Sequence, residues 1–317
     1  MAYTMWSSYP WSKFADVYLT CYKNEEREKW YFKQNPEKKD KILIPLQDAD
    51  FTNEYWFAPA FNTKKDIDIL YVSRIAEVKN IPIFVEALKK YKEKYKRQLR
   101  AVMLLGSLPD NQNANAKKIL AAVKAKYGDI RRYVTLVDSV KYSEMCKYYS
   151  RAKFTILTSL IESKNRTIQE SMACNTPIIV FKDHNKWARG KHEIISENAG
   201  LYVPEFSAEA LADTIYNGLE NYQGKFTPRK SYLRKNGRKH FVNTCVDSIP
   251  YFKDNLPEYE QGRIQDNLWV DLAMQDNYQL SFNDFIYGKN LAIQQVKCHE
   301  NSHSLVDFFF SRFGIRH

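Results

Sequence analysis

Two carboxylates, Glu162 and Glu170, stand at a predicted strand-to-helix junction with seven residues between them. The run 158–180 predicts a strand ending at Ser159, a loop carrying Glu162, and a helix opening near Thr167 with Glu170 in its first turn. Loops at the carboxyl ends of parallel strands form ligand crevices, and a helix N-terminus offers free N–H groups to an anion. The two carboxylates are therefore candidates to hold hydroxyl groups, one on a sugar and one on a ribose. The alternative is that Glu170 favours the helix dipole and Glu162 is a solvated loop residue.

Two cations, Arg74 and Lys79, follow the predicted strand 67–73 and precede a helix. The planar fork of an arginine and the point charge of a lysine together suit a diphosphate. A single arginine at a strand end is more often a surface ion-pair residue. However, both charged segments fall on the same edge of the predicted sheet, where one ligand can touch all four groups.

Short apolar runs alternate with helix-period segments from about residue 66 onward, which is typical of βαβ units around a parallel sheet. Strands are predicted at 67–73, 101–106, 133–137, 154–158, 177–181 and 200–203. Helices are predicted at 82–97, 113–127, 142–151, 167–174, 189–197 and 207–222. Before residue 60 we expect one helix, 14–30, and one strand, 41–45; beyond about residue 243 an aromatic and charged tail follows. The fold class is therefore α/β, a Rossmann-like parallel sheet with helices on both faces.

Net charge and cysteine content restrict the class of partner and the cellular setting. The 317 residues carry 48 Lys and Arg against 37 Asp and Glu, a net charge of +11 that indicates an anionic partner: nucleic acid, an acidic lipid surface or a phosphorylated small molecule. The five cysteines are scattered without a C-x-x-C pair, so we expect neither disulfides nor a metal site and assign a reducing, cytoplasmic setting. Neither a secretory leader nor a membrane-spanning stretch is expected from the sequence.

The segments SRIAEVKN, VTLVDSVKYSEMCKYYSRAKFTILTS, ES…TIQESMACNTPIIV and RGKHEIISENAGLYV together resemble the group 1 (family 4) glycosyltransferases of the GT-B fold, over roughly residues 10–240. The resemblance implies that Arg74 and Lys79 bind the diphosphate of a nucleotide-sugar donor. It also implies that Glu162 faces the donor sugar and Glu170 the ribose, in an E-x7-E motif. Arg74, Lys79 and Glu162 are thus the candidate catalytic residues.

The same resemblance extends the donor site to neighbouring loops. The further donor-binding candidates are Ser163, Lys164, Asn165, Arg166, Thr167, Gly106, Val137, Asp138 and Val140. Gly190 and Glu193 match a glycine and an acid of the family at the next helix. The implied reaction is a retaining, metal-independent sugar transfer that uses the nucleotide-sugar as substrate and needs no cofactor.

Three departures from the family pattern matter. Lys164, Asn165 and Arg166 stand where the family has an apolar-glycine-apolar trio, and Asn175 replaces a glycine. Asparagine tolerates the left-handed conformation better than most residues, so both turns are expected to survive. The family's acceptor-binding N-terminal domain is reduced to a remnant, 1–60, before the nucleotide-sugar-binding domain, 61–242, and a C-terminal extension, 243–317.

Several partners and functions follow as expectations. The acceptor is an unidentified glycan, lipid or protein, and a partner chain is a candidate source of the missing acceptor domain. Basic clusters at 89–100 and 229–239 make a peripheral membrane contact a further candidate. The alternatives are a non-catalytic module that binds nucleotide-sugars or partner proteins, and a nucleic-acid-binding protein, which no recognised motif supports.

Overall fold

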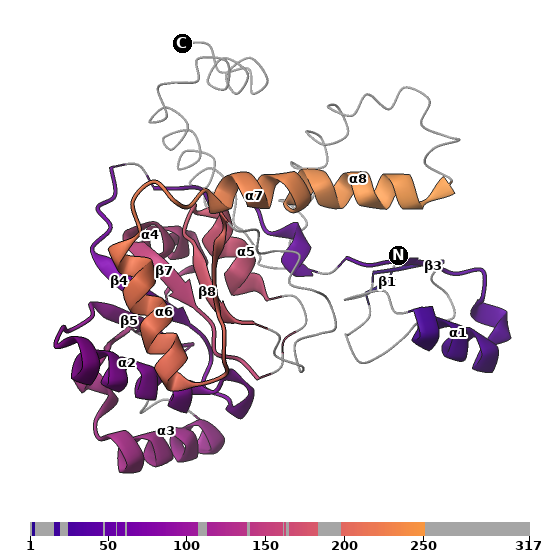
Figure 1. Ribbon diagram of the computed structural model, residues 1–317. Helices are drawn as coiled ribbons and strands as arrows, with labels where there is room; N and C mark the ends of the chain where they lie inside the picture. The colour runs from indigo at the N-terminus through magenta and orange to yellow at the C-terminus, as the bar shows by residue number, and fades with distance from the viewer. Residues whose placement is uncertain are drawn as a thin grey trace, which may run out of the picture.

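The computed structural model describes residues 2–3, 16–19, 25–46, 48–54, 56–60, 62–106, 113–137, 140–160, 162, 165–182 and 198–250. Most of them form one six-stranded parallel sheet with helices on both faces, as the sequence predicts (Figure 1). Its strands are β4 (Ile67–Val72), β5 (Ala101–Leu104), β6 (Thr135–Val137), β7 (Ala152–Ile156), β8 (Ile178–Phe181) and β9 (Gly200–Val203). Their spatial order is β6-β5-β4-β7-β8-β9, so the chain reverses its direction across the sheet between β4 and β7.

Each face of this sheet buries its own apolar core. The helices α2 (Ile81–Tyr95), α3 (Ala114–Tyr127) and α6 (Ala208–Glu220) pack on one face, and α4 (Met145–Arg151) and α5 (Arg166–Ala173) on the other. Phe84 of α2 and Ile215 of α6 are fully buried in the first core, and Tyr149 and Met172 in the second. Because a buried side chain of this size contributes about 1.5–3 kcal/mol, the two cores fix the positions at which the strands end.

The N-terminal region forms a small sheet of its own. Its three parallel strands, β1 (Ala2–Tyr3), β2 (Val17–Leu19) and β3 (Ile42–Ile44), lie in that order, and α1 (Glu25–Gln34) precedes β3 in the chain. The prediction of one helix over 14–30 is therefore wrong at 17–19, which form a strand, whereas 25–30 are helical. The apolar residues of 17–19 pair with β3 and pack on a distant helix, and this tertiary pairing outweighs the local helical pattern.

Two helices that the sequence did not indicate connect the two sheets. α7 (Pro228–Lys235) packs on α5, and α8 (Arg238–Ser248) runs on from it to the small sheet, where Cys245 and Ile249 pack with Ile44 (Figure 1). Arg229 of α7 donates to the carbonyl oxygens of Glu54 and Phe57, each at 3.0 Å, and to that of Ala173. One side chain thus ties the connecting segment to the end of α5.

Short 3₁₀ turns complete the described structure. They are Pro36–Lys38, Asp48–Phe51 (η2), Glu77–Lys79 (η3), Ile130–Arg132 and Tyr142–Glu144. No described helix is long and apolar enough to cross a lipid bilayer.

Candidate active site

The predicted charged residues meet where the chain changes direction across the sheet. β4 and β7 are neighbours, with Ile69 paired to Phe154, so the loops that follow Val72 and Ile156 leave the sheet side by side. In open α/β sheets, the crevice outside such a reversal point is where ligands bind. The fold therefore brings Arg74 and Lys79, after β4, to the same edge as Glu162, after β7.

Hydrogen bonds join these two loops. The Leu160 N–H donates to the Val78 carbonyl at 2.6 Å, and the Thr158 hydroxyl donates to the Lys79 carbonyl at 2.9 Å. The hydroxyl of Tyr71, a buried β4 residue, donates to the same Lys79 carbonyl at 2.7 Å. Burial raises the pKa of Tyr71 well above its usual value, so it remains a neutral donor. Two side chains thus hold the carbonyl oxygen of Lys79, and the Leu160 N–H holds that of the preceding residue, Val78.

The side chain of Lys79 forms an ion pair with Glu162. The pair is mostly shielded from water, with 17% of the Lys79 side chain and 10% of the Glu162 side chain exposed. Arg74, five residues before Lys79, is exposed, and within the described residues its guanidinium has no acidic partner. The interpretation of Glu162 as a solvated loop residue is therefore wrong, and the site holds one paired and one unpaired cation.

The opening of α5 lies directly after Glu162 in the chain. Asn165 is its N-cap: the side-chain oxygen accepts from the Thr167 N–H at 2.8 Å, as asparagine does at this position. Arg166 and Thr167 are half-buried in the first turn. Asparagine in place of the family's glycine thus serves as a cap, with no left-handed backbone required. Asn175 does adopt the left-handed conformation, with a φ of 57°. The expectation that asparagine can replace glycine in this turn is therefore confirmed.

Glu170 lies deeper than the sequence suggested. It is the fifth residue of α5, not a first-turn residue, and it is buried; its Oε2 accepts from the hydroxyl of Tyr149 in α4 at 2.8 Å. Burial raises the pKa of Glu170 to about 7, opposed by the Tyr149 hydrogen bond and by the charge of Arg166. A buried carboxylate with one neutral donor retains acceptor capacity for further hydroxyl groups.

The remaining predicted residues spread along the neighbouring strand ends. Gly106 is exposed just beyond β5, and a Cβ there would meet no described atom within 4 Å, so the space above it is open. Val137 ends β6 and Val140 is half-buried three residues later. Asp138, Ser163, Lys164, Gly190, Glu193 and the predicted helix 189–197 lie outside the described residues.

Sequence reasoning missed the supporting side chains. Tyr71 and Thr158 hold Lys79, and Tyr149 holds Glu170. Tyr149 lay in the quoted segment KYYSRAKF, but two adjacent tyrosines gave no signal as to which one faces α5. The contacts of Tyr71 join residues far apart in the chain and leave no local pattern.

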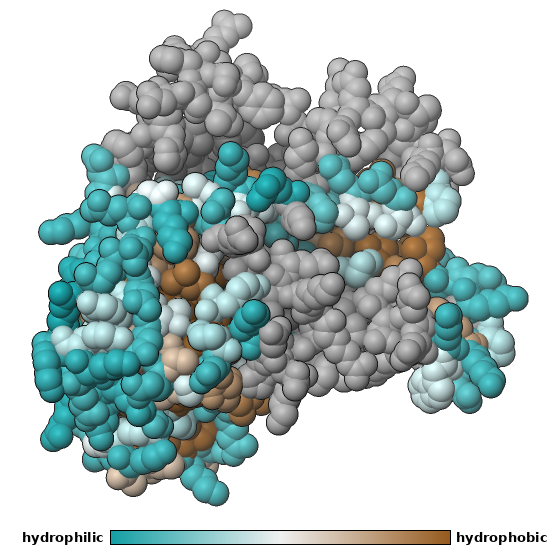
Figure 2. Space-filling view, viewed as in Figure 1, coloured by the Kyte–Doolittle hydropathy of each residue, from teal (hydrophilic) through white to brown (hydrophobic). Residues whose placement is uncertain are grey.

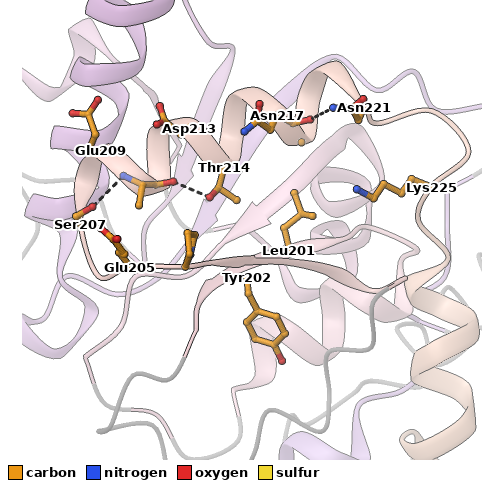
Figure 3. A pocket seen from close by; sticks show the side chains of 13 residues that line it. Leu201, Tyr202, Glu205, Ser207, Glu209, Asp213, Thr214, Asn217, Asn221 and Lys225 are labelled. Atoms are coloured by element: carbon orange, nitrogen blue, oxygen red, sulfur yellow. Dashed lines mark hydrogen bonds between the residues drawn. The ribbon is translucent and has the colours of Figure 1, made fainter.

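A separate hollow lies at the outer edge of the sheet, away from these loops (Figure 3). It has a volume of about 480 Å³ and runs between β9 and α6. Its polar side chains largely serve α6: Ser207 caps the helix at the Ala210 N–H, Thr214 donates to the Ala210 carbonyl, and Asp213 binds Lys94. It contains none of the predicted site residues, so it is not the site described above.

A comparison with family models decides the family. The model of "Glycosyl transferases group 1" matches residues 53–240. The chain belongs to this glycosyltransferase family.

Relatives of the chain agree with this family assignment. It is 26% identical over 152 residues to a D-inositol 3-phosphate glycosyltransferase of Pseudarthrobacter chlorophenolicus, covering 45% of this chain and 34% of that protein. A sucrose-phosphate synthase of Thermosynechococcus elongatus has a similar structure, with a TM-score of 0.54 and 21% identity over 77% of this chain and 59% of the other.

The pneumococcal O-GlcNAc transferase GtfA, solved with UDP and GlcNAc, gives a TM-score of 0.52 and 16% identity over 75% of this chain and 45% of its own. At these identities the solved structures establish the GT-B type of fold alone. The chain spans about a third of the curated relative and about half of these solved chains.

Proposed function

We propose that the protein transfers a sugar from a nucleotide-sugar donor to a hydroxyl group of an acceptor, with retention of configuration and without a metal ion. The observation that carries this proposal is the meeting of Arg74, Lys79 and Glu162 outside the reversal point of the sheet, beside α5 with its buried Glu170. Family membership supports the sugar transfer itself.

In this proposal the two cations act on the leaving group. The bond between the sugar C1 and the diphosphate oxygen breaks, the diphosphate keeps the electron pair, and the acceptor oxygen forms the new bond to C1 as it loses its proton. Arg74 and Lys79 stabilise the charge that develops on the diphosphate, which is the main term in reactions of this kind. The two cations supply the countercharge, so the reaction needs neither a divalent metal nor another cofactor.

The carboxylates hold the two ends of the donor. Glu170 accepts from the ribose hydroxyls, and Glu162 contacts the sugar. Val137, Asp138 and Val140 contact the base, with Gly106 beside it. The N–H groups at the start of α5, from Asn165 to Thr167, favour the anionic part of the donor, with Ser163 and Lys164 in the preceding loop.

The proposal extends to the acceptor and to the cellular location of the protein. We propose a glycan, lipid or protein acceptor, a cytoplasmic location, and a peripheral membrane contact through the basic clusters at 89–100 and 229–239. A second polypeptide that supplies acceptor contacts is consistent with the partial coverage of the relatives. The second candidate function is a module that binds the donor without turnover.

The test begins with titration calorimetry of UDP, GDP, ADP and dTDP. We expect one of them to bind selectively, and Glu170→Gln to weaken that nucleotide while leaving inorganic pyrophosphate, which has no ribose, unchanged. Transfer from the matching nucleotide-sugar in the presence of EDTA, with the product anomer read by NMR, then tests retention and metal independence. No binding of any nucleotide by the folded protein would refute the proposal; binding without transfer would favour the module.

A further inference from the structure

The cation of Lys79 is already occupied by a carboxylate of the same site. Lys79 and Glu162 are in direct contact, 83 residues apart in sequence, and little water reaches either side chain. Water and salt screen an ion pair with so little exposure only weakly. Glu162 therefore competes effectively with any other anion that approaches Lys79. A diphosphate that approaches Lys79 must therefore compete with Glu162.

The backbone around this pair is tied down by hydrogen bonds that leave the two side-chain charges out. Lys79 is fixed through its carbonyl oxygen by Tyr71 and Thr158, and the Leu160 N–H holds the carbonyl of the preceding residue, Val78. None of these bonds involves the ammonium or the carboxylate. Exchange of partners thus requires rotation of the Lys79 and Glu162 side chains and breaks none of these backbone hydrogen bonds.

We infer that Glu162 is an internal counter-ion of Lys79 that the donor diphosphate displaces. This inference rests on the proposed function, because it takes the diphosphate to be the incoming anion. Displacement frees the Glu162 carboxylate at the moment when the diphosphate is captured. The sugar-facing carboxylate is therefore released by the correct leaving group, and a sugar that carries no diphosphate does not release it.

The test measures Kd for the nucleoside diphosphates UDP, GDP, ADP and dTDP, which lack the sugar and so report only the competition for Lys79. We expect Glu162→Gln to tighten binding of the preferred nucleotide about three- to tenfold. Glu162→Asp keeps the charge but shortens the side chain by one methylene, so it should also tighten binding. The matched control is Glu77→Gln, which removes the same charge from an exposed residue of η3 with no contact to Lys79. It should change Kd by less than twofold.

The outcomes separate the inference from the function on which it rests. If Lys79→Ala weakens the nucleotide but Glu162→Gln binds it as the parent does, or more weakly, the counter-ion role is refuted and the site stands. If Glu162→Gln tightens binding and Glu162→Asp does not, simple repulsion explains the gain and the inference also fails. If neither Lys79→Ala nor Arg74→Ala changes any Kd, the diphosphate site itself is refuted. Thermal unfolding of each variant confirms that it is folded.

Discussion

Arginine, lysine and carboxylate side chains are paired differently at the amino ends and at the carboxyl ends of the strands of the large sheet. At the amino ends of the strands, Asp68 accepts three hydrogen bonds from Arg100 and one from Lys153, and Asp66 accepts a two-point hydrogen bond from Arg151. At the carboxyl ends, Arg74 is exposed without an acidic partner among the described residues, and Lys79 has only Glu162.

This difference separates charges that hold the fold together from charges that are available to a ligand. The arginines at the amino ends are engaged by these carboxylates, so we expect the pairs there to contribute to stability alone. A cation with one exchangeable partner, or with none, can bind an incoming anion. The comparison predicts that mutations at one end change stability and that mutations at the other end change affinity.

The largest effect is expected for Arg74→Ala. Loss of one charge-assisted contact should weaken the preferred nucleoside diphosphate by about 1.5–3 kcal/mol, a ten- to hundredfold rise in Kd measured by titration calorimetry. The free energy of unfolding should stay within about 0.5 kcal/mol, because the side chain is exposed. Arg132→Ala, an exposed arginine of the 3₁₀ turn before β6, is the control and should change neither quantity. A large loss of stability in Arg74→Ala would contradict the comparison.

At the opposite end, Asp68→Asn should lower the free energy of unfolding by about 1–2 kcal/mol in urea. The range is discounted because 53% of the Arg100 side chain is exposed. Nucleotide affinity of the folded variant should be unchanged. Burial alone would raise the pKa of Asp68, but hydrogen bonds from Arg100 and Lys153 outweigh it and lower the pKa to about 2. The parent should therefore lose this stabilisation as the pH falls from about 4 to 2, and the variant should lack that dependence.

Tyr149→Phe tests the deeper carboxylate. The lost hydroxyl should cost about 1 kcal/mol of stability, because it leaves Glu170 without its donor. It should also raise the pKa of Glu170 further above about 7, so that nucleotide binding by the ionised carboxylate begins at a higher pH than in the parent. Calorimetry from pH 6 to 8.5 measures that shift. The control is Tyr148→Phe, and an unshifted profile in Tyr149→Phe would remove the coupling to Glu170.

Glu170 also affects stability in its own right. Its pKa is raised in the folded state, so the folded protein binds more protons than the unfolded chain between the two pKa values. Its contribution is therefore present below about pH 4.5 and is lost as the pH rises through about 7, the reverse of the behaviour of Asp68.

The smallest effect is expected for Asp66→Asn. The pair with Arg151 is well aligned but exposed, with hydrogen bonds of 2.8 and 2.9 Å. Solvent screens such pairs, so urea unfolding should show a loss of at most about 1 kcal/mol. If Asp66→Asn lowered the free energy of unfolding more than Asp68→Asn does, burial would not determine which ion pair at the amino ends contributes more to stability.

The sequence was sufficient for features that depend on local pattern. Apolar runs such as 67–73 and 177–181 predicted the buried strands, and residues that follow two such strands were correctly expected at one edge. The sequence could not predict that Glu162 contacts Lys79, because which of two nearby cations meets a carboxylate depends on the geometry of the loops. The burial of Glu170 was also missed, since it depends on Tyr149 from another helix.

The return of α8 to the small N-terminal sheet constrains the order of events during synthesis. Ile44 of β3 is covered by Cys245 and Ile249, about 200 residues later in the chain. At about 5–20 residues per second, the ribosome delivers that cover some ten to forty seconds after β3 has been made. The large sheet has all its strands by Val203 and can fold in the meantime. We therefore expect the small sheet to acquire its core after the large sheet, although β3 is translated earlier, and to need protection by chaperones until then.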